Sequence, residues 1–357
     1  MSVFAHCDPV HQRSTHMTPC ETLADQVLQG HAVTREEGRT ILQTDEAWLL
    51  PLVNAAYKIR HAFWGRNVTL QMLLNAKSGA CQEDCHYCSQ SSISTHSIDR
   101  YALVSPETML QAAYRAHEAN AQRYCVVISG RTPLEKEITG IASAVKRIKR
   151  ELPIQVCCSV GLLTASQATQ LKAAGVDRIN HNLNTSEAYH PSICTTHTYH
   201  DRMTTLHNAR AAGLELCSGG IIGMGESDDD LLDLAFALRD VAPDSIPLNM
   251  LHPMPGTPLA DATHLTPHRC LVILCLFRFI HPKRELRAAG GREFNLRSLQ
   301  PLALYIADSL FVNGYLTTPG QPADEVQQMI KDMGFEVATG SPACTTSSCP
   351  SVSPVVP

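Results

Sequence analysis

The stretch Ser78–Gln90 reads SGACQEDCHYCSQ and places three cysteines in one short loop, at Cys81, Cys85 and Cys88. A closed tetrahedral zinc site needs four protein ligands, and so does an electron-transfer iron–sulfur cluster. The next cysteine, Cys125, lies too far along the chain to belong to this loop. Three thiolates on a 4Fe-4S cube would leave one iron open to a molecule that is not protein. The alternative is a zinc knuckle or a set of buried thiols.

Outward from this loop, short β-rich runs alternate with amphipathic helical stretches. The loop follows the first of eight runs, which are Asn67–Asn75, Arg123–Ser129, Ile154–Val160, Arg178–Asn184, Leu214–Ile222, Ser245–His252, Arg284–Ala289 and Ser309–Val312. Eight strands alternating with helices over roughly 220 residues predict an α/β fold of the (β/α)8 TIM-barrel type. The three cysteines would then lie at the C-terminal face of the barrel, where βα loops build active sites.

The remaining segments divide by composition and periodicity. Residues 21–64 are expected to form an N-terminal helical extension, because apolar residues recur there at helical spacing. Residues 65–335 are assigned to the barrel. Residues 1–20 are expected to be flexible, and residues 341–357, which are rich in Ser, Thr and Pro, are expected to form a disordered tail.

Composition limits the class of protein. A chain of 357 residues that is 44% hydrophobic can bury a large core. Its formal net charge of −5 and its lack of a long basic run argue against nucleic acid as a partner. No run of 18 apolar residues predicts a membrane span, and the N-terminus lacks the apolar core of a secretory signal. Fourteen cysteines without an export signal therefore predict a cytoplasmic protein whose thiols are metal ligands or buried side chains.

A second set of cysteines lies in the β-rich runs themselves. Cys125 is in the second run, Cys157 and Cys158 are in the third, and Cys217 is in the fifth. Side chains alternate across a strand, so Cys157 and Cys158 must point to opposite sides. One cysteine from each of three strands could converge inside the barrel on a second metal site. Each could equally be a small buried hydrophobe, and periodicity alone leaves that choice open.

The first loop resembles that of the radical S-adenosylmethionine enzymes. In that superfamily the open iron takes the amino and carboxylate groups of the cosubstrate, and an aromatic residue before the third cysteine lies against its adenine. Tyr87 occupies that position here. The resemblance therefore implies a 4Fe-4S cluster on the three cysteines, with S-adenosylmethionine beside Tyr87.

From about Val68 to Thr318 the chain resembles the biotin synthase family. The matching motifs, in order, are AQRYCVVISGR, CCSVGLL, INHNLNTS, ELCSGGIIGMGE, IPLNMLHPMPGTPL and LRAAGGRE. The resemblance implies a homodimeric (β/α)8 enzyme that inserts sulfur into dethiobiotin and takes electrons from a donor such as flavodoxin or ferredoxin with its reductase. It also implies an auxiliary 2Fe-2S cluster on four ligands, namely Cys125, Cys157, Cys217 and Arg287. The cofactors carry this chemistry, so no catalytic acid, base or nucleophile is expected among the side chains.

Polar residues near the strand ends are expected to hold the organic ligands. Asn180, Asn182 and Asn184 alternate in sequence, so they are expected to share one face of the fourth strand. Amide groups both donate and accept, which suits ribose hydroxyls and a ureido group. By resemblance, Asn180, Asn184 and Glu226 would bind the cosubstrate, and Asn182 and Asn249 would bind dethiobiotin. The family usually has aspartate where this chain has Asn184.

Two other classes remain as alternatives. A sister radical enzyme, such as a hydrogenase cofactor maturase or a methylornithine-forming mutase, would share the loop and the barrel but not the full auxiliary ligand set. A non-catalytic iron–sulfur or zinc protein would instead give each metal site a complete set of protein ligands. Among the other cysteines, Cys194 is expected to have no partner at ligand spacing.

Overall fold

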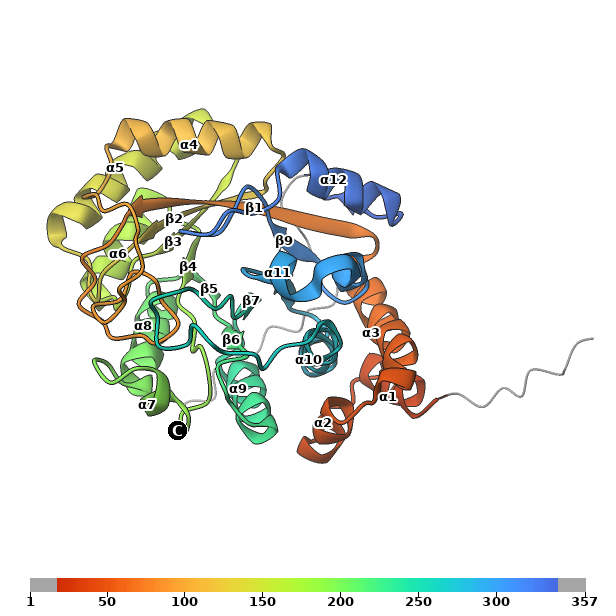
Figure 1. Cartoon of the computed structure of the whole chain (residues 1–357). Helices are drawn as coiled ribbons and strands as arrows, with labels where there is room; N and C mark the ends of the chain where they lie inside the picture. The colour runs from red at the N-terminus through yellow and green to blue at the C-terminus, as the bar shows by residue number, and fades with distance from the viewer. Residues whose placement is uncertain (1–17, 340–357) are drawn as a thin grey trace, which may run out of the picture.

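The computed structural model describes residues 18–339, and its centre is a closed barrel of parallel strands (Figure 1). Eight strand positions follow in chain order: β1 (Asn67–Lys77), β2 (Arg123–Ile128), β3 (Gln155–Ser159), β4 (Arg178–Asn180), β5 (Glu215–Cys217) with β6 (Gly220–Ile222), β7 (Ser245–Met250), β8 (Glu285–Ala288) and β9 (Ser309–Phe311). Neighbours in this order are hydrogen-bonded, and β9 pairs back with β1 through Ser309 and Thr69. The predicted (β/α)8 barrel is confirmed.

The fifth barrel position is divided into two short strands, where the sequence predicts one run. β5 ends at Cys217 and β6 begins at Gly220. A Cβ atom on Gly219 would lie only 1.9 Å from the carbonyl oxygen of Pro247 in β7. The chain can therefore pass this point only with glycine, and the close approach of two backbones interrupts the strand.

β4 ends at Asn180, four residues before the predicted end of that run. The chain then leaves the extended conformation, and Asn184 adopts a left-handed φ of 72°, which asparagine tolerates better than most residues. The prediction that Asn180, Asn182 and Asn184 share one strand face is therefore wrong. Asn184 instead forms a single parallel bridge with Gly220 of β6.

Helices surround the barrel (Figure 1). They are α4 (Pro106–Glu118), α5 (Glu135–Glu151), α6 (Ala165–Ala174), α7 (His190–Ile193), α8 (Tyr199–Ala211), α9 (Asp228–Val241), α10 (Pro267–Ile280), α11 (Arg292–Leu296) and α12 (Ala323–Asp332). The side chains of Ser105 and Thr164 accept from backbone N–H groups in the first turns of α4 and α6, which satisfies donors that the helix leaves unpaired. The hydrophobic core fills the space between the strands and these helices.

From residue 18 to the barrel the chain forms three α-helices, α1 (Pro19–Leu28), α2 (Arg35–Leu42) and α3 (Leu49–Trp64), with a short 3-10 helix (Glu46–Trp48) before the third. α3 packs against α1 and α10, and α2 packs against α9 and α10 (Figure 1). The Thr18 side chain caps α1, so this helix begins inside the segment that the sequence predicts to be flexible. The rest of that segment, and the predicted tail, lie outside the described residues. Between residues 18 and 339, no helix is long and apolar enough to cross a lipid bilayer.

Candidate active site

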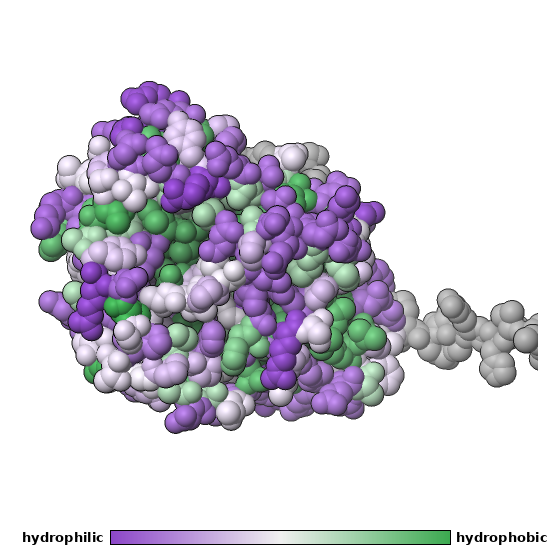
Figure 2. All heavy atoms as spheres, turned by 45° about the horizontal axis from the view of Figure 1, so that its top comes forward, coloured by the Kyte–Doolittle hydropathy of each residue, from purple (hydrophilic) through white to green (hydrophobic). Residues whose placement is uncertain are grey.

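A cavity of about 320 Å³ opens where the barrel strands end, and it is lined by the loops that follow them. Figure 2 shows a mostly hydrophilic surface, with hydrophobic residues in a hollow at the upper left and in patches elsewhere on this face. The three cysteines of the first loop line the cavity, and so does Cys125 of β2. Residues from the two cysteine sets, far apart in sequence, therefore face one space.

The first loop is held in place by local hydrogen bonds. Gly79 donates its N–H to the side chain of Gln90 at 2.9 Å, and Cys88 donates to the carbonyl of Cys85 at 3.1 Å. Cys85 is buried, whereas Cys81 and Cys88 are half-buried. Burial raises the pKa of Cys88 to about 11. Its proton would leave when iron binds, because a thiolate and not a thiol is the metal ligand.

The second set converges inside the barrel. Cys125 of β2 and Cys157 of β3 are direct partners in the strand register. Arg287 of β8 donates from Nη1 to Sγ of Cys217 at 3.6 Å. A hydrogen bond from Cys125, and then the positive charges of neighbouring arginines, hold the pKa of Cys157 below its ordinary value despite burial. Cys158 instead packs in the hydrophobic core outside the strands, as side-chain alternation requires.

Three acceptors fix the guanidinium of Arg287. Its Nε donates to Oγ of Ser309 at 3.1 Å, and its Nη2 donates to Oγ of Ser245 at 2.8 Å and to Oε1 of Glu285 at 2.6 Å. Nη1 is therefore the nitrogen that faces Cys217. One nitrogen is thus presented to Sγ of Cys217 while the other two are held by protein oxygens. Burial alone would lower the pKa of Arg287, but the negative groups of Cys217 and Glu285 raise that pKa, so its guanidinium is here a hydrogen-bond donor and would have to lose a proton to bind iron.

Glu285 is the centre of a charge network that the sequence reasoning missed. Its carboxylate is buried and pairs with Arg123 at 3.1 Å, Arg178 at 3.1 Å and Arg287 at 2.6 Å. Burial alone would raise its pKa, but the three guanidinium groups hold that pKa well below the ordinary value. The spacing of these residues from the predicted metal ligands could have indicated the network. Arg123 precedes Cys125 by two residues and Glu285 precedes Arg287 by two, so each pair shares a strand face.

The predicted organic-ligand residues gather at the cavity with one exception. Those that line it are Tyr87, Asn180, Asn182, Asn184 and Asn249. Glu226 is not among the lining residues. Its two carboxylate oxygens accept the N–H groups of Gly223 at 2.6 Å and Met224 at 2.7 Å, so it stabilises its own loop.

The amide groups at the cavity already have protein partners. Asn184 donates to the hydroxyl of Tyr87 at 2.5 Å, and Asn180 donates to Sγ of Cys217 at 3.2 Å. Asn182 accepts from Gly219 N at 3.2 Å. Asn249 donates to Gly220 O at 3.2 Å and accepts from Gly290 N at 3.1 Å. These contacts orient each amide and leave it further hydrogen-bonding capacity, since an amide has two donors and two lone pairs.

His181 is a further cavity residue that the sequence reasoning passed over. It lines the cavity, and its Nε2 is a buried atom with no hydrogen-bond partner within the described part of the chain. Burial lowers its pKa well below the ordinary value, so the imidazole is neutral. A buried polar atom without a partner is costly, and a polar ligand in this cavity would relieve that cost.

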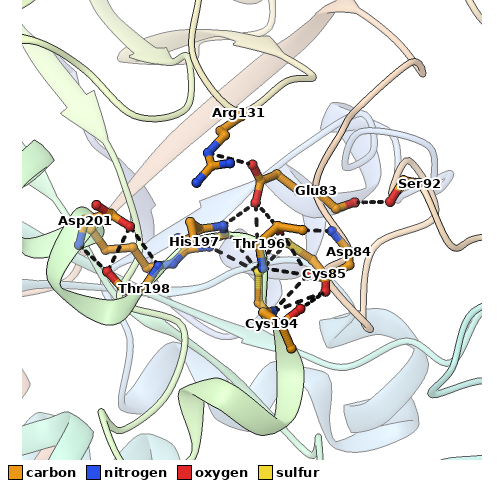
Figure 3. Close-up of polar contacts among 12 residues, drawn as sticks. Glu83, Asp84, Cys85, Ser92, Arg131, Cys194, Thr196, His197, Thr198 and Asp201 are labelled. Atoms are coloured by element: carbon orange, nitrogen blue, oxygen red, sulfur yellow. Dashed lines mark hydrogen bonds and ion pairs between the residues drawn. The ribbon is translucent and has the colours of Figure 1, made fainter.

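Cys194 does have close partners, contrary to the sequence prediction (Figure 3). Its Sγ lies 3.8 Å from Sγ of Cys85 and 3.3 Å from Nδ1 of His197. His197 lies only three residues after Cys194, whereas the sequence separation of 109 residues hid the proximity of Cys194 to Cys85. Tertiary folding creates it, because the backbone N–H of His86 bonds to the carbonyl of Ile193 at 3.0 Å.

Comparison with known proteins agrees with this geometry. Residues 76–238 match the family model of the radical SAM superfamily, and residues 247–336 match that of the biotin and thiamin synthesis associated domain. Methylornithine synthase PylB superposes with a TM-score of 0.79 at 19% identity, covering 89% of this chain and 97% of that one. The hydrogenase maturase HydG from Carboxydothermus hydrogenoformans superposes with a TM-score of 0.74 at 17% identity, covering 88% and 78%. At these identities the two structures establish the fold alone.

Relatives found by sequence share a much higher identity with this chain than these two structures do. The biotin synthase of Geobacillus kaustophilus is 51% identical, covering 88% of this chain and 95% of its own length. That of Rhodopirellula baltica is 49% identical, covering 90% and 89%. That of Bacillus subtilis is 50% identical, covering 88% and 94%. With these relatives and the two cysteine sets in one barrel, the chain belongs to the biotin synthase family of the radical SAM superfamily.

Proposed function

We propose that this chain converts dethiobiotin to biotin by radical sulfur insertion, with S-adenosylmethionine as cosubstrate. The observation that carries the proposal is that the three loop cysteines and Cys125 line one cavity, while Cys157 lies beside Cys125 in the strand register. Cys81, Cys85 and Cys88 would hold a 4Fe-4S cluster at the mouth. The deeper ligands of a 2Fe-2S cluster would be Cys125, Cys157, Cys217 and Arg287. When bound, these groups supply the electron that cleaves the cosubstrate and the sulfide that enters the product.

The residues of the chain would position the reactants and exclude water. Tyr87 and Asn184, joined by their hydrogen bond, form one polar part of the cavity wall and would contact the cosubstrate. Asn182 and Asn249 form another part and would contact the ureido group. The Glu285 network keeps Arg287 fixed and balances buried positive charge. Glu226 would then act on the cosubstrate only through the loop that it stabilises.

We also propose that the chain acts in the cytoplasm as a homodimer that receives electrons from flavodoxin or ferredoxin with its reductase. The support is the family resemblance. Anaerobic reconstitution with iron, sulfide, reductant, dethiobiotin and S-adenosylmethionine tests the central activity, with biotin as the product measured. Cosubstrate cleavage without biotin would favour a sister radical enzyme, and no cleavage at all would favour a non-catalytic metal protein.

The strand register yields a matched pair of variants. Cys157→Ala should lose the visible absorbance of the auxiliary cluster and biotin formation, while it keeps cosubstrate cleavage. Cys158→Ala should retain the auxiliary-cluster absorbance, biotin formation and cosubstrate cleavage, because its side chain packs in the hydrophobic core outside the strands. Absorbance spectra, iron content and biotin yield distinguish the two variants, whereas the 5′-deoxyadenosine yield should show that both still cleave the cosubstrate. The reverse pattern would show that the ligand has been assigned to the wrong side of β3.

The amide residues yield a binding prediction. Asn182→Ala should weaken dethiobiotin binding by about ten- to hundred-fold, because an unpaired buried polar group costs about 1–3 kcal/mol. Asn249→Ala should show a similar loss and also a lower free energy of unfolding, since its amide bonds the backbones of Gly220 and Gly290. The dissociation constant is measured anaerobically with S-adenosylmethionine present. Unchanged constants in both variants would remove these amides from the substrate site.

A further inference from the structure

Cys85, Cys194 and His197 form a compact buried group beside the first cysteine loop (Figure 3). Their potential ligand atoms all lie within 4.8 Å of one another. Sγ of Cys194 is 3.8 Å from Sγ of Cys85, and it is 3.3 Å from Nδ1 and 3.9 Å from Nε2 of His197. This spacing is close enough for one ion to bind all three side chains after small rotations.

Hydrogen bonds join the two loops that carry the group. Asp84 accepts the N–H groups of Thr195 at 2.9 Å and Thr196 at 3.3 Å, which holds the first loop against the segment that carries Cys194. Because these hydrogen bonds join the two loops, the backbones that carry Cys85 and Cys194 are held side by side and only side-chain rotations are needed to form the site.

A carboxylate completes the arrangement from the first loop. Nδ1 of His197 is hydrogen-bonded to Oε2 of Glu83, and Arg131 pairs with the other oxygen of Glu83 at 3.4 Å. All of Glu83, Cys85, Cys194 and His197 are more than nine-tenths buried. A histidine that donates one ring N–H to a carboxylate presents its other nitrogen, here Nε2, as a metal ligand.

We propose that, when the chain lacks its clusters, Cys85, Cys194 and His197 bind one divalent zinc or ferrous ion. Two thiolates and an imidazole are ligands that both ions accept, and three protein ligands leave a fourth position for water. Zinc binds such a site more tightly than ferrous iron does. The site is separate from the auxiliary ligands, and it requires two residues outside every cysteine motif of the sequence.

The consequence is competition at Cys85. If Cys85 is also a ligand of the 4Fe-4S cluster, the single ion and the cluster compete for its thiolate. A zinc ion at this site would therefore block assembly of the first cluster. This consequence rests on the proposed function, whereas the zinc site itself does not.

Zinc titration of the full chain tests the site. The protein is freed of clusters with chelator and reductant, kept anaerobic, and titrated with zinc against a chromophoric chelator. Cys194→Ala should lose one binding site or weaken it by on the order of 100-fold, because a thiolate ligand has gone. Cys275→Ala is the matched control, since Cys275 is fully buried in α10 away from the group. Cobalt in place of zinc should show weaker thiolate-to-metal absorption in Cys194→Ala than in the control.

Two outcomes would overturn the zinc site. One is equal zinc stoichiometry and affinity in Cys194→Ala, Cys194→Ser and the control. The other is unchanged cobalt absorption in both Cys194 variants, whose folding is checked by circular dichroism. Competition has its own readout, because zinc-loaded wild-type chain should fail to take up the first cluster while Cys194→Ala takes it up in the presence of zinc. Equal uptake by both would refute the competition and leave the zinc result to stand alone.

Discussion

Cys81→Ala and Cys88→Ala should each reduce the formation of 5′-deoxyadenosine from S-adenosylmethionine to background. The loop supplies three thiolates for a cluster that needs all three, and both side chains line the cavity where the cosubstrate would bind. With two thiolates the cube would have a second iron without a protein ligand, so the electron source for cleavage would no longer be held. The measurement is chromatographic detection of 5′-deoxyadenosine after anaerobic reconstitution with dithionite, together with iron content.

Cys275→Ala is the control for this prediction. Cys275 is fully buried in α10 and lies outside both cysteine sets, so this variant should cleave the cosubstrate at the wild-type rate. Cleavage at that rate by Cys81→Ala or Cys88→Ala would show that the loop does not hold the radical-generating cluster. Because neither residue belongs to the proposed zinc group, the result does not depend on that inference.

Glu285→Gln should lower the free energy of unfolding by about 3–5 kcal/mol, the usual cost of removing one partner from a buried ionic group. The neutral amide keeps the shape of the side chain but leaves the charges of Arg123, Arg178 and Arg287 without their shared carboxylate. Nη2 of Arg287 would keep only neutral acceptors, Ser245 Oγ and the amide oxygen, in place of a carboxylate, so the guanidinium is held less firmly and the absorbance of the auxiliary cluster should fall. Urea denaturation and the visible spectrum measure the two effects.

Glu215→Gln is the matched control for Glu285→Gln. Glu215 also pairs with Arg178, at 2.7 Å, but 45% of its side chain is exposed. Solvent screens that pair, so its loss should cost at most about 1 kcal/mol. If the two variants were equally destabilised, the three buried ion pairs of Glu285 would not contribute more than one exposed pair.

The architecture follows from local periodicity. Eight β-rich runs and the capping residues Ser105 and Thr164 predict the order of strands and helices that the structure has. Local signals fail where one backbone meets another. β5 is interrupted because Gly219 passes against Pro247, and β4 stops at Asn180, before the three asparagines can alternate. The residue pattern within a single run predicts neither the interruption of β5 nor the early end of β4.

The features of the site also fall into those that the sequence determines and those that only the folded structure decides. The sequence by itself determined the three-thiolate loop and, through the two-residue period of β3, the opposite placement of Cys157 and Cys158. It could not show that Cys194 lies beside Cys85, because loops separated by 109 residues meet only in the folded chain. Nor could it show that Glu285 gathers arginines from three strands. Motifs encode chemistry that is local in the chain, whereas the closure of the barrel decides which distant charges and thiols share one buried volume.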